Sequence, residues 1–442
     1  MSRCRSLWLA CLLIAAALWL SHERAIAANE CINLQAIIDQ AKPGDAIALA
    51  PGSYEGPIII NKPLTLRAEQ EGSVQLHNSS LKPAVLITAD HVAIIGLSLV
   101  DEGLKDEPTI LATGNQASLE GLHIRTGSMG IAIRDADDGA VSDTTIHWAV
   151  NGVRMADKGN GIDMFNADRW TLTSNSIHDV HDGIYLENSD DIIVSGNVIE
   201  RSRYGVHCMY TKRTIIEGNE GNRNVTGAMV MAAKQVFVVG NSFTKQSENV
   251  NSQGILLYDA HDTEVADNTV DGNRVGVYVE ESTNNHFRNN RVRYNFIGVQ
   301  LIQSSGNTIT GNAFMGNVAD AQAQGSEDNR LMDNYWDSFQ GLDTDGDGRS
   351  DLSYAINPFF QSIARKRPAF QLFFQSPGMI FLEGLYQTDR ERWTEDSTPL
   401  LAPLDRQLHR DKSGDGVKTG LMGLMLLGCA SLLFYKMRRR ER

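Results

Sequence analysis

Four side chains near the middle of this 442-residue sequence have the chemistry and the spacing to hold one soft metal ion. His207 and Met209 lie two residues apart, and Met229 and Met231 repeat this spacing 22 residues later. Imidazole and thioether donors suit Cu(I), and they are poor ligands for calcium or magnesium. The alternative interpretation is an apolar docking patch, because methionine-rich faces adapt to many protein partners.

A pair of histidines forms a second candidate. His178 and His181 have the i, i+3 spacing of a ligand pair. They are a candidate for an accessory metal site; the alternative is two solvated side chains, because a lone pair of surface histidines is more often solvated. His147 precedes a glycine by five residues, as His178 does, and is expected to stack near His178.

An acidic segment near the end of the chain forms a third candidate. Its carboxylates occupy positions 1, 3, 5 and 9 of an EF-hand-type calcium loop, with Gly348 at position 6. These carboxylates belong to Asp343, Asp345, Asp347 and Asp351. Tyr354 stands where the loop needs a bidentate glutamate, and no helical pattern flanks the segment. A structural Ca²⁺ site and an Asp/Gly turn without metal are therefore both open.

Catalytic residues are harder to identify. Enzymes that cleave or epimerise polysaccharides need clustered carboxylates, or a base beside a basic residue. The outward acidic positions are interrupted by other residue types, and the arginines considered lie on repeats without an aligned acidic partner. The acidic positions are Asp163, Glu187 and Glu280, and the arginines are Arg154, Arg203 and Arg274. We therefore expect no enzyme activity, with a polysaccharide-binding or polysaccharide-modifying enzyme of the cell envelope as the alternative.

A 22-residue repeat must position these side chains. Asparagines and glycines form two columns that share this period and one step of 27 residues. The asparagines are Asn175, Asn197, Asn219, Asn241, Asn268, Asn290, Asn312 and Asn334, and the glycines are Gly161, Gly183, Gly205, Gly227, Gly254, Gly276 and Gly298. We expect the asparagines to stack as a ladder in a turn and to adopt the left-handed backbone conformation there.

Each repeat contains three short runs of alternating apolar and polar residues, which predict three strands per repeat. This pattern is typical of an all-β fold, the right-handed parallel β-helix, with one coil per repeat. Alternation turns the first and third residues after each column glycine into the core, including Cys208, and turns the second and fourth outward. His207, Met209, Met229 and Met231 should then share one outer face, on coils about 4.8 Å apart.

The predicted β-helix spans residues 29–358. Leu34 to Asp39 reads as a short amphipathic helix that caps the first coil, as open solenoid ends require. The segments Pro51 to Tyr54 and Lys62 to Leu66 resemble the opening coils of the pectate-lyase-like β-helix superfamily.

Both ends of the chain carry targeting signals. Residues 1–28 combine Arg3 and Arg5, an apolar run and an Ala-x-Ala site, which predicts a cleaved signal peptide and export. Residues 419–435 are uncharged and precede a basic tail at 436–442, which predicts a membrane anchor with its tail in the cytoplasm. The net charge of −14 argues against a nucleic-acid partner, and the two cysteines left in the exported body, Cys31 and Cys208, indicate no disulfide framework.

The closing phrase from Asn334 to Ser338, the Asp-rich segment and an aromatic stretch at 370–386 add a family resemblance. With the export signal and the repeats, this chain resembles NosD, the periplasmic β-helix family of nitrous oxide reductase maturation. The resemblance implies a non-enzymatic accessory protein that works with an ABC-type ATPase through a membrane permease. It also implies transient copper, a copper-donating periplasmic chaperone and the apo-reductase as partners, at the outer face of the cytoplasmic membrane. The four-residue copper candidate comes from the residues and not from the resemblance.

Residues 359–418 are predicted to be an aromatic tail and an extended tether. The apolar part of the tail could lie on the permease, or it could cap the last coil. The sequence leaves these two alternatives open.

Overall fold

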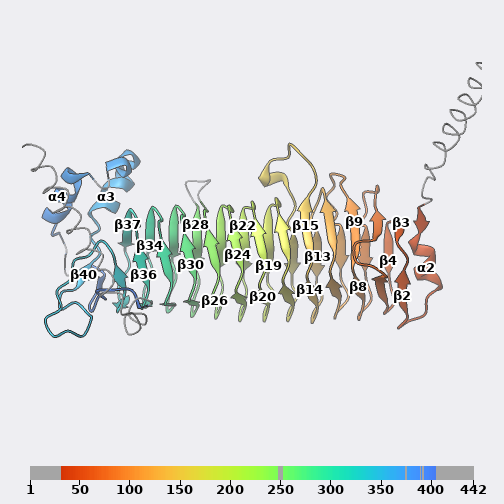
Figure 1. The fold of residues 1–442 in the computed structure, drawn as a ribbon, viewed down its shortest axis with the longest axis horizontal. Coiled ribbons are helices and arrows are strands. Elements are labelled where there is room, and N and C mark those ends of the chain that lie inside the picture. Colours follow the sequence, from red (N-terminus) through yellow and green to blue (C-terminus); the bar gives the residue numbers. More distant parts are fainter. Residues whose placement is uncertain (1–30, 247–251, 374–375, 389, 391–392, 405–442) are drawn as a thin grey trace, which may run out of the picture.

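The chain folds into a right-handed parallel β-helix of about 14 turns, bounded by three long sheets (Figure 1). The computed structural model describes residues 31–246, 252–373, 376–388, 390 and 393–404. Neighbouring coils pair in parallel, and antiparallel pairing occurs at the C-terminal end. The predicted all-β architecture is therefore confirmed.

The candidate site lies on a 12-stranded sheet, which we call sheet C. Its strands are β4 (Ile58–Ile60), β7 (Val85–Ile87), β10 (Ile110–Ala112), β13 (Ile131–Arg134), β16 (Ile162–Phe165), β19 (Asp182–Glu187), β22 (Tyr204–Met209), β25 (Thr226–Met231), β28 (Gln253–Tyr258), β31 (Val275–Glu280), β34 (Ile297–Ile302) and β37 (Ala319–Gln324).

The 14-stranded sheet, sheet A, and the 15-stranded sheet, sheet B, complete each coil. Sheet A contains β1 (Ile32–Asn33), β3 (Gly52–Glu55), β6 (Val74–His77), β9 (Leu97–Asp101), β12 (His123–Thr126), β15 (Thr145–Trp148), β18 (Ser176–His178), β21 (Val198–Glu200), β24 (Glu220–Asn222), β27 (Ser242–Thr244), β30 (Thr269–Asp271), β33 (Arg291–Arg293), β36 (Ala313–Met315) and β39 (Tyr335–Trp336). Sheet B contains β2 (Ala46–Leu49), β5 (Thr65–Ala68), β8 (Ala93–Ile95), β11 (Ser118–Glu120), β14 (Ala140–Ser142), β17 (Thr171–Thr173), β20 (Ile193–Ser195), β23 (Ile215–Glu217), β26 (Phe237–Val239), β29 (Glu264–Ala266), β32 (His286–Arg288), β35 (Thr308–Thr310), β38 (Arg330–Met332), β40 (Tyr354–Ala355) and β41 (Glu395–Asp396).

The asparagine column is a buried hydrogen-bonded ladder. Asn219 donates through Nδ2 to Asn241 Oδ1 at 3.0 Å and to the carbonyl of Val194 at 2.9 Å, and it accepts from Asn197 at 2.9 Å. The expected left-handed conformation at the asparagines is wrong. Positive φ falls on the residue before each one, for example Gly218 and Gly240, and none of the column asparagines adopts it. The asparagine side chain forms hydrogen bonds to backbone groups at the turn between two strands, while the preceding residue adopts the positive φ that the turn requires.

The column positions are glycine because the neighbouring coil leaves no space for a Cβ atom. A Cβ on Gly183 would lie 2.4 Å from Ile199 Cγ2 and 2.6 Å from the carbonyl oxygen of Gly205. The same crowding recurs along the column, so each coil stacks on the next with no room for a side chain at this position. The inward positions that follow each glycine are buried as predicted, and Cys208 is fully buried.

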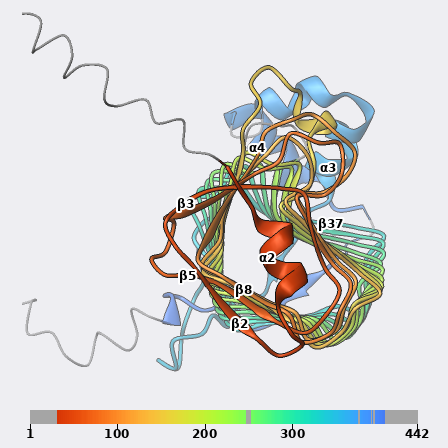
Figure 2. The same ribbon diagram turned by 90° about the vertical axis from the view of Figure 1, so that its right-hand side faces the viewer.

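Helix α2 (Leu34–Gln40) caps the first coil at the position predicted for residues 34–39 (Figure 2). Asn33 begins it, since its Oδ1 accepts the backbone N–H of Ala36 at 3.1 Å. Leu34 and Ile38 are fully buried, so the helix closes the apolar interior that the first coil would otherwise expose.

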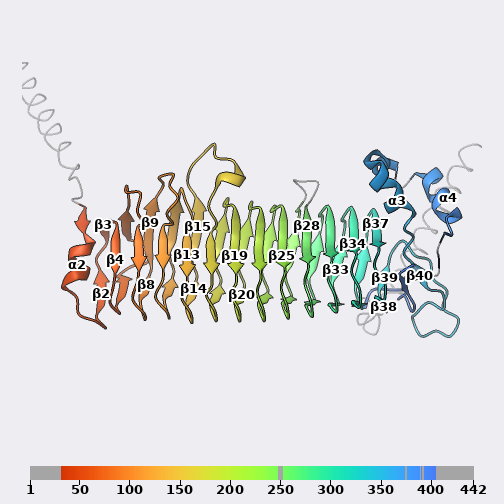
Figure 3. The same cartoon turned by 180° about the vertical axis from the view of Figure 1, so that it is seen from behind.

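The C-terminal end is closed by a returning strand and two helices. Asp396 in β41 accepts hydrogen bonds from Asn334 Nδ2 at 2.9 Å and from Trp336 Nε1 at 3.0 Å, and it thereby ends the ladder. Beyond it, α3 (Phe359–Lys366), the short 3-10 segment η2 (Pro368–Phe373) and α4 (Pro377–Leu385) project from the side that also carries the loop at 149–160 (Figure 3). Phe360 and Met379 pack with Phe296 and Ala319, so part of the predicted aromatic tail does cap the last coils.

The predicted signal peptide (1–28), the membrane anchor (419–435) and the basic tail (436–442) lie outside the described residues, as does most of the tether. Among the residues that are described, no helix is long and apolar enough to cross a membrane. The boundaries predicted for these segments stay predictions.

Candidate functional site

Strand pairing places the four copper candidates side by side on sheet C. His207 in β22 is the direct partner of Met229 in β25, and Met209 is the direct partner of Met231. Val206 and Cys208, which alternate with them, are fully buried in the core. The register therefore puts all four side chains on the outer side of the sheet, as the repeat predicts.

His207 is nevertheless covered, which alternation alone did not predict. Its residue exposure is 6%, whereas the three methionines are half-buried. The ring of Tyr185 lies 4.9 Å from the imidazole, and the ring of Tyr204 lies 4.8 Å from it. The histidine thus sits in an aromatic recess at the edge of the methionine face.

Asp182, on the preceding coil, orients His207. Asp182 Oδ2 lies 3.1 Å from His207 Nδ1, and Arg203 donates to the same carboxylate through Nε at 2.8 Å and Nη2 at 2.6 Å. Burial opposes the charge of Asp182, but the hydrogen bonds from Arg203 and His207 outweigh it and lower the pKa to about 2. The ionised carboxylate can only accept, so Nδ1 carries the proton in neutral His207.

This arrangement leaves the other ring nitrogen available. His207 Nε2 is buried and has no hydrogen-bond partner in the described part of the structure. A buried nitrogen lone pair without a donor is costly, and such groups are rare in folded proteins. With Nδ1 held by a carboxylate, Nε2 has the arrangement that metal-ligating histidines usually have. The donor set of one imidazole nitrogen and three thioethers fits Cu(I).

The two histidines of the accessory pair lie in different surroundings. His178 Nε2 lies 2.7 Å from Ser176 Oγ on sheet A, and its pKa is lowered by burial and then by Arg201. His181 lies on the turn before β19, where burial lowers its pKa and Asp182, Arg203 and His207 act on it. Different charged groups therefore surround the two rings. His147 pairs with His178 in register, as expected.

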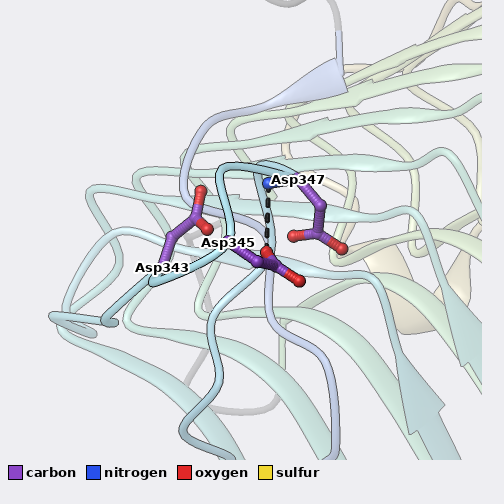
Figure 4. A group of neighbouring side chains, drawn as sticks. All are labelled: Asp343, Asp345 and Asp347. Atoms are coloured by element: carbon purple, nitrogen blue, oxygen red, sulfur yellow. Dashed lines mark hydrogen bonds between the residues drawn. The ribbon is translucent and has the colours of Figure 1, made fainter.

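The Asp-rich loop gathers three of its four predicted ligands. The carboxylates of Asp343, Asp345 and Asp347 can all come within 4.8 Å of one another (Figure 4). Asp351 instead accepts the backbone N–H and the hydroxyl of Thr344, at 2.9 and 2.6 Å. Asp343 also accepts the N–H groups of Gly346 and Gly348, so the loop is ordered by its own hydrogen bonds.

The sequence interpretation missed the groups that surround His207. Arg203 was expected to lack an aligned acidic partner, and this is wrong, because it holds Asp182 in a two-pronged ion pair. Asp182 directly precedes a column glycine, and Tyr204 precedes the next one, so both belonged to the repeat register. The sequence signal that could have revealed this contact is the position of Asp182, a carboxylate one coil before the outward-facing His207.

Solved structures similar to this chain include an epimerase, a lyase and an exopolygalacturonase, all at low sequence identity. The A-module of a mannuronan C-5 epimerase from Azotobacter vinelandii is 14% identical with a TM-score of 0.50, covering 67% of this chain and 93% of its own. A PL6 alginate lyase in complex with a trisaccharide is 13% identical with a TM-score of 0.55, covering 69% and 84%. A family 28 exopolygalacturonase from Yersinia enterocolitica is 11% identical with a TM-score of 0.57, covering 70% and 77%. At these identities the likeness shows the fold alone.

No curated protein matches the chain significantly. The family described as periplasmic copper-binding protein (NosD) matches residues 151–344, a range that contains β16 to β38 and the four copper candidates. The resemblance predicted from the sequence is thereby confirmed over residues 151–344, where the chain matches the NosD family of periplasmic copper-binding proteins.

Proposed function

We propose that this chain is a periplasmic accessory protein that receives Cu(I) and presents it for assembly of a copper site in another protein. The ion is cargo: it is held briefly by His207 Nε2 and the thioethers of Met209, Met229 and Met231. The observation that carries this proposal is the buried, unpartnered Nε2 of His207, directly opposite Met229 in the next coil. The copper-binding description of the matched family supports the same choice of metal.

The partners follow from the family resemblance. The apo form of nitrous oxide reductase is the acceptor, a periplasmic chaperone is the donor, and an ABC-type ATPase acts through its permease. The apolar run at 419–435 tethers the chain to the outer face of the cytoplasmic membrane. The exposed position of sheet C suits transfer, because half-buried methionines can exchange an ion with a partner more readily than a closed core site.

A Cu(I) titration against a competing chelator tests the proposal. The mature chain should bind one ion tightly, and the variant His207→Ala/Met229→Ala should lose this binding while keeping its fold. The matched control is His123→Ala/Met315→Ala, which removes the same residue types from the outer face of sheet A. Equal affinity in the site variant and the control would refute the site.

A second function is favoured by one observation. Two tyrosines surround the His207 ring and Arg203 lies beside them, and together with the histidine such groups could serve as base, acid and charge partner for a uronic acid polymer. Tyr185 is, however, engaged with Glu187 Oε2 at 2.8 Å, and burial followed by this hydrogen bond raises its pKa. Incubation with alginate and polygalacturonate separates the two functions: new unsaturated or epimerised products, lost in Tyr185→Phe, would indicate the enzyme.

A further inference from the structure

Several large apolar side chains are exposed in the C-terminal helical segment. Six large apolar side chains within 16 residues are between 38% and 66% exposed. They are Phe370, Phe373, Ile380, Phe381, Leu382 and Leu385. Soluble proteins rarely leave such clusters uncovered, because each buried CH₂ group is worth about 0.8 kcal/mol. Capping of the last coils does not account for these side chains, since Met379 and Phe360 face the coils instead.

We propose that this surface, which we call the α4 patch, inserts into the interfacial region of an anionic lipid bilayer. The exposed residues of α4 are Pro377, Gly378, Ile380, Phe381, Leu382, Gly384 and Leu385, which are all uncharged. Protein interfaces carry about one hydrogen bond per 100–200 Å² and a polar rim. A face without polar side chains is better matched by the boundary between lipid head groups and acyl chains.

The charge of the segment fits the same partner. Residues 359–388 contain three basic residues, at 365–367, and one acidic residue, Glu383, in a chain whose net charge is −14. Glu383 is half-buried and lines a cavity of about 460 Å³ beneath the helix, so it does not repel a lipid surface. Lys366 and Arg367 are exposed beside the α4 patch, where they can contact anionic head groups.

The position of the α4 patch in the chain agrees with this assignment. Helices α3 and α4 project from the C-terminal end of the β-helix (Figure 1), and the described chain ends at residue 404. The predicted anchor begins at residue 419, and the 14 residues between it and residue 404 span at most about 50 Å. If residues 419–435 cross the membrane, residue 404 is held within about 50 Å of its surface. The α4 patch would then be a second contact, which fixes how the body is oriented against the bilayer.

Site-specific fluorescence on the full mature chain tests this inference. In a background with Cys31→Ser and Cys429→Ser, Phe381→Cys or Leu385→Cys is labelled with the environment-sensitive dye NBD; Cys208 stays buried. The chain is mixed with vesicles of phosphatidylethanolamine and phosphatidylglycerol at 3:1. The control carries the dye at Phe237→Cys, an exposed position on sheet B.

We expect NBD at residues 381 and 385 to shift to shorter wavelength and to be quenched by spin labels in the lipid acyl chains. NBD at residue 237 should do neither. If both patch positions behave like residue 237, the lipid assignment is overturned, even when the chain floats with the vesicles. The two independent positions guard against a label that disturbs folding, and thermal melts of each labelled chain check this directly. The result is independent of copper binding, because no residue of the copper site is changed.

Discussion

Replacing Asp320 with asparagine should tighten the C-terminal end of the β-helix at neutral pH. Asp320 is 4% exposed in β37 and lines the cavity that α3 and α4 cover. Its carboxylate accepts from Ser338 Oγ at 2.5 Å and from Asn317 Nδ2 at 3.2 Å. Burial raises its pKa to about 6, against the hydrogen bonds from Ser338 and Asn317.

The magnitude follows from the pKa. In the closed state, α3 and α4 cover Asp320; in the opened state they have come away from it. A rise of the pKa from an ordinary value of 3.8 to about 6 corresponds to a cost of about 3 kcal/mol for keeping the charge in the closed state. Between pH 4 and 6 the closed state holds a proton that the opened state has lost. Stability therefore falls as pH rises through this window, and the full cost is present above pH 6. Asparagine removes the charge and can keep the hydrogen bonds to Asn317 and to the Ser338 hydroxyl, which can accept as well as donate; it loses only the long 3.4 Å contact with the Ser338 N–H.

Hydrogen exchange of the amides in α3, α4 and β37 measures the effect, because opening of this cap is local. At pH 7.5, D320N should slow their exchange by up to about 100-fold relative to the native chain. At pH 4 the two chains should agree within about threefold once intrinsic rates are corrected. Equal exchange at pH 7.5, or an unchanged difference at pH 4, would refute the reasoning that the buried charge is responsible.

Three further predictions concern other parts of the molecule. D182N should lower Cu(I) affinity by about 10- to 100-fold in the chelator competition, because the proton of neutral His207 is then no longer held on Nδ1 and Nε2 is less available as a ligand. An unchanged affinity would show that Asp182 serves only the fold. N219A should lower the free energy of unfolding by about 3 kcal/mol in guanidinium, since it leaves backbone and side-chain partners on two coils unsatisfied, whereas the surface change T310A on sheet B should have little effect. Millimolar Ca²⁺ should protect the Asp-rich loop from proteolysis in the native chain but not in the triple variant D343N/D345N/D347N. Equal protection of both chains would contradict a calcium site in this loop.

The fold could be predicted because it is repeated. Each coil is specified by the same asparagine and glycine, and eight asparagines in register leave little freedom for another architecture. The residues with positive φ were harder to locate from the sequence, since they are of many types, including Ser174, Asp267 and Asn289. They share only the backbone conformation of the turn, which does not select one residue type.

The candidate site was predicted in part. Alternation gives the side of the sheet on which His207 lies, but it says nothing about what covers that side. Its burial depends on Tyr185 and Asp182 from the preceding coil and on Tyr204 from its own. These contacts combine residues up to 25 positions apart, and their geometry depends on side-chain rotamers that no spacing rule contains.

Because the coils are evenly spaced along the axis, the number of coils between two sites fixes the distance between them. Five strand steps of sheet C, from β22 to β37, separate His207 from the strand that α3 contacts, which amounts to about 24 Å. Removing or adding one 22-residue coil would move the metal-binding face by about 4.8 Å along the axis without altering its chemistry. The number of repeats between the methionines and the terminal helices would therefore set the height at which cargo is handed over, and related chains could adjust this height in whole coils.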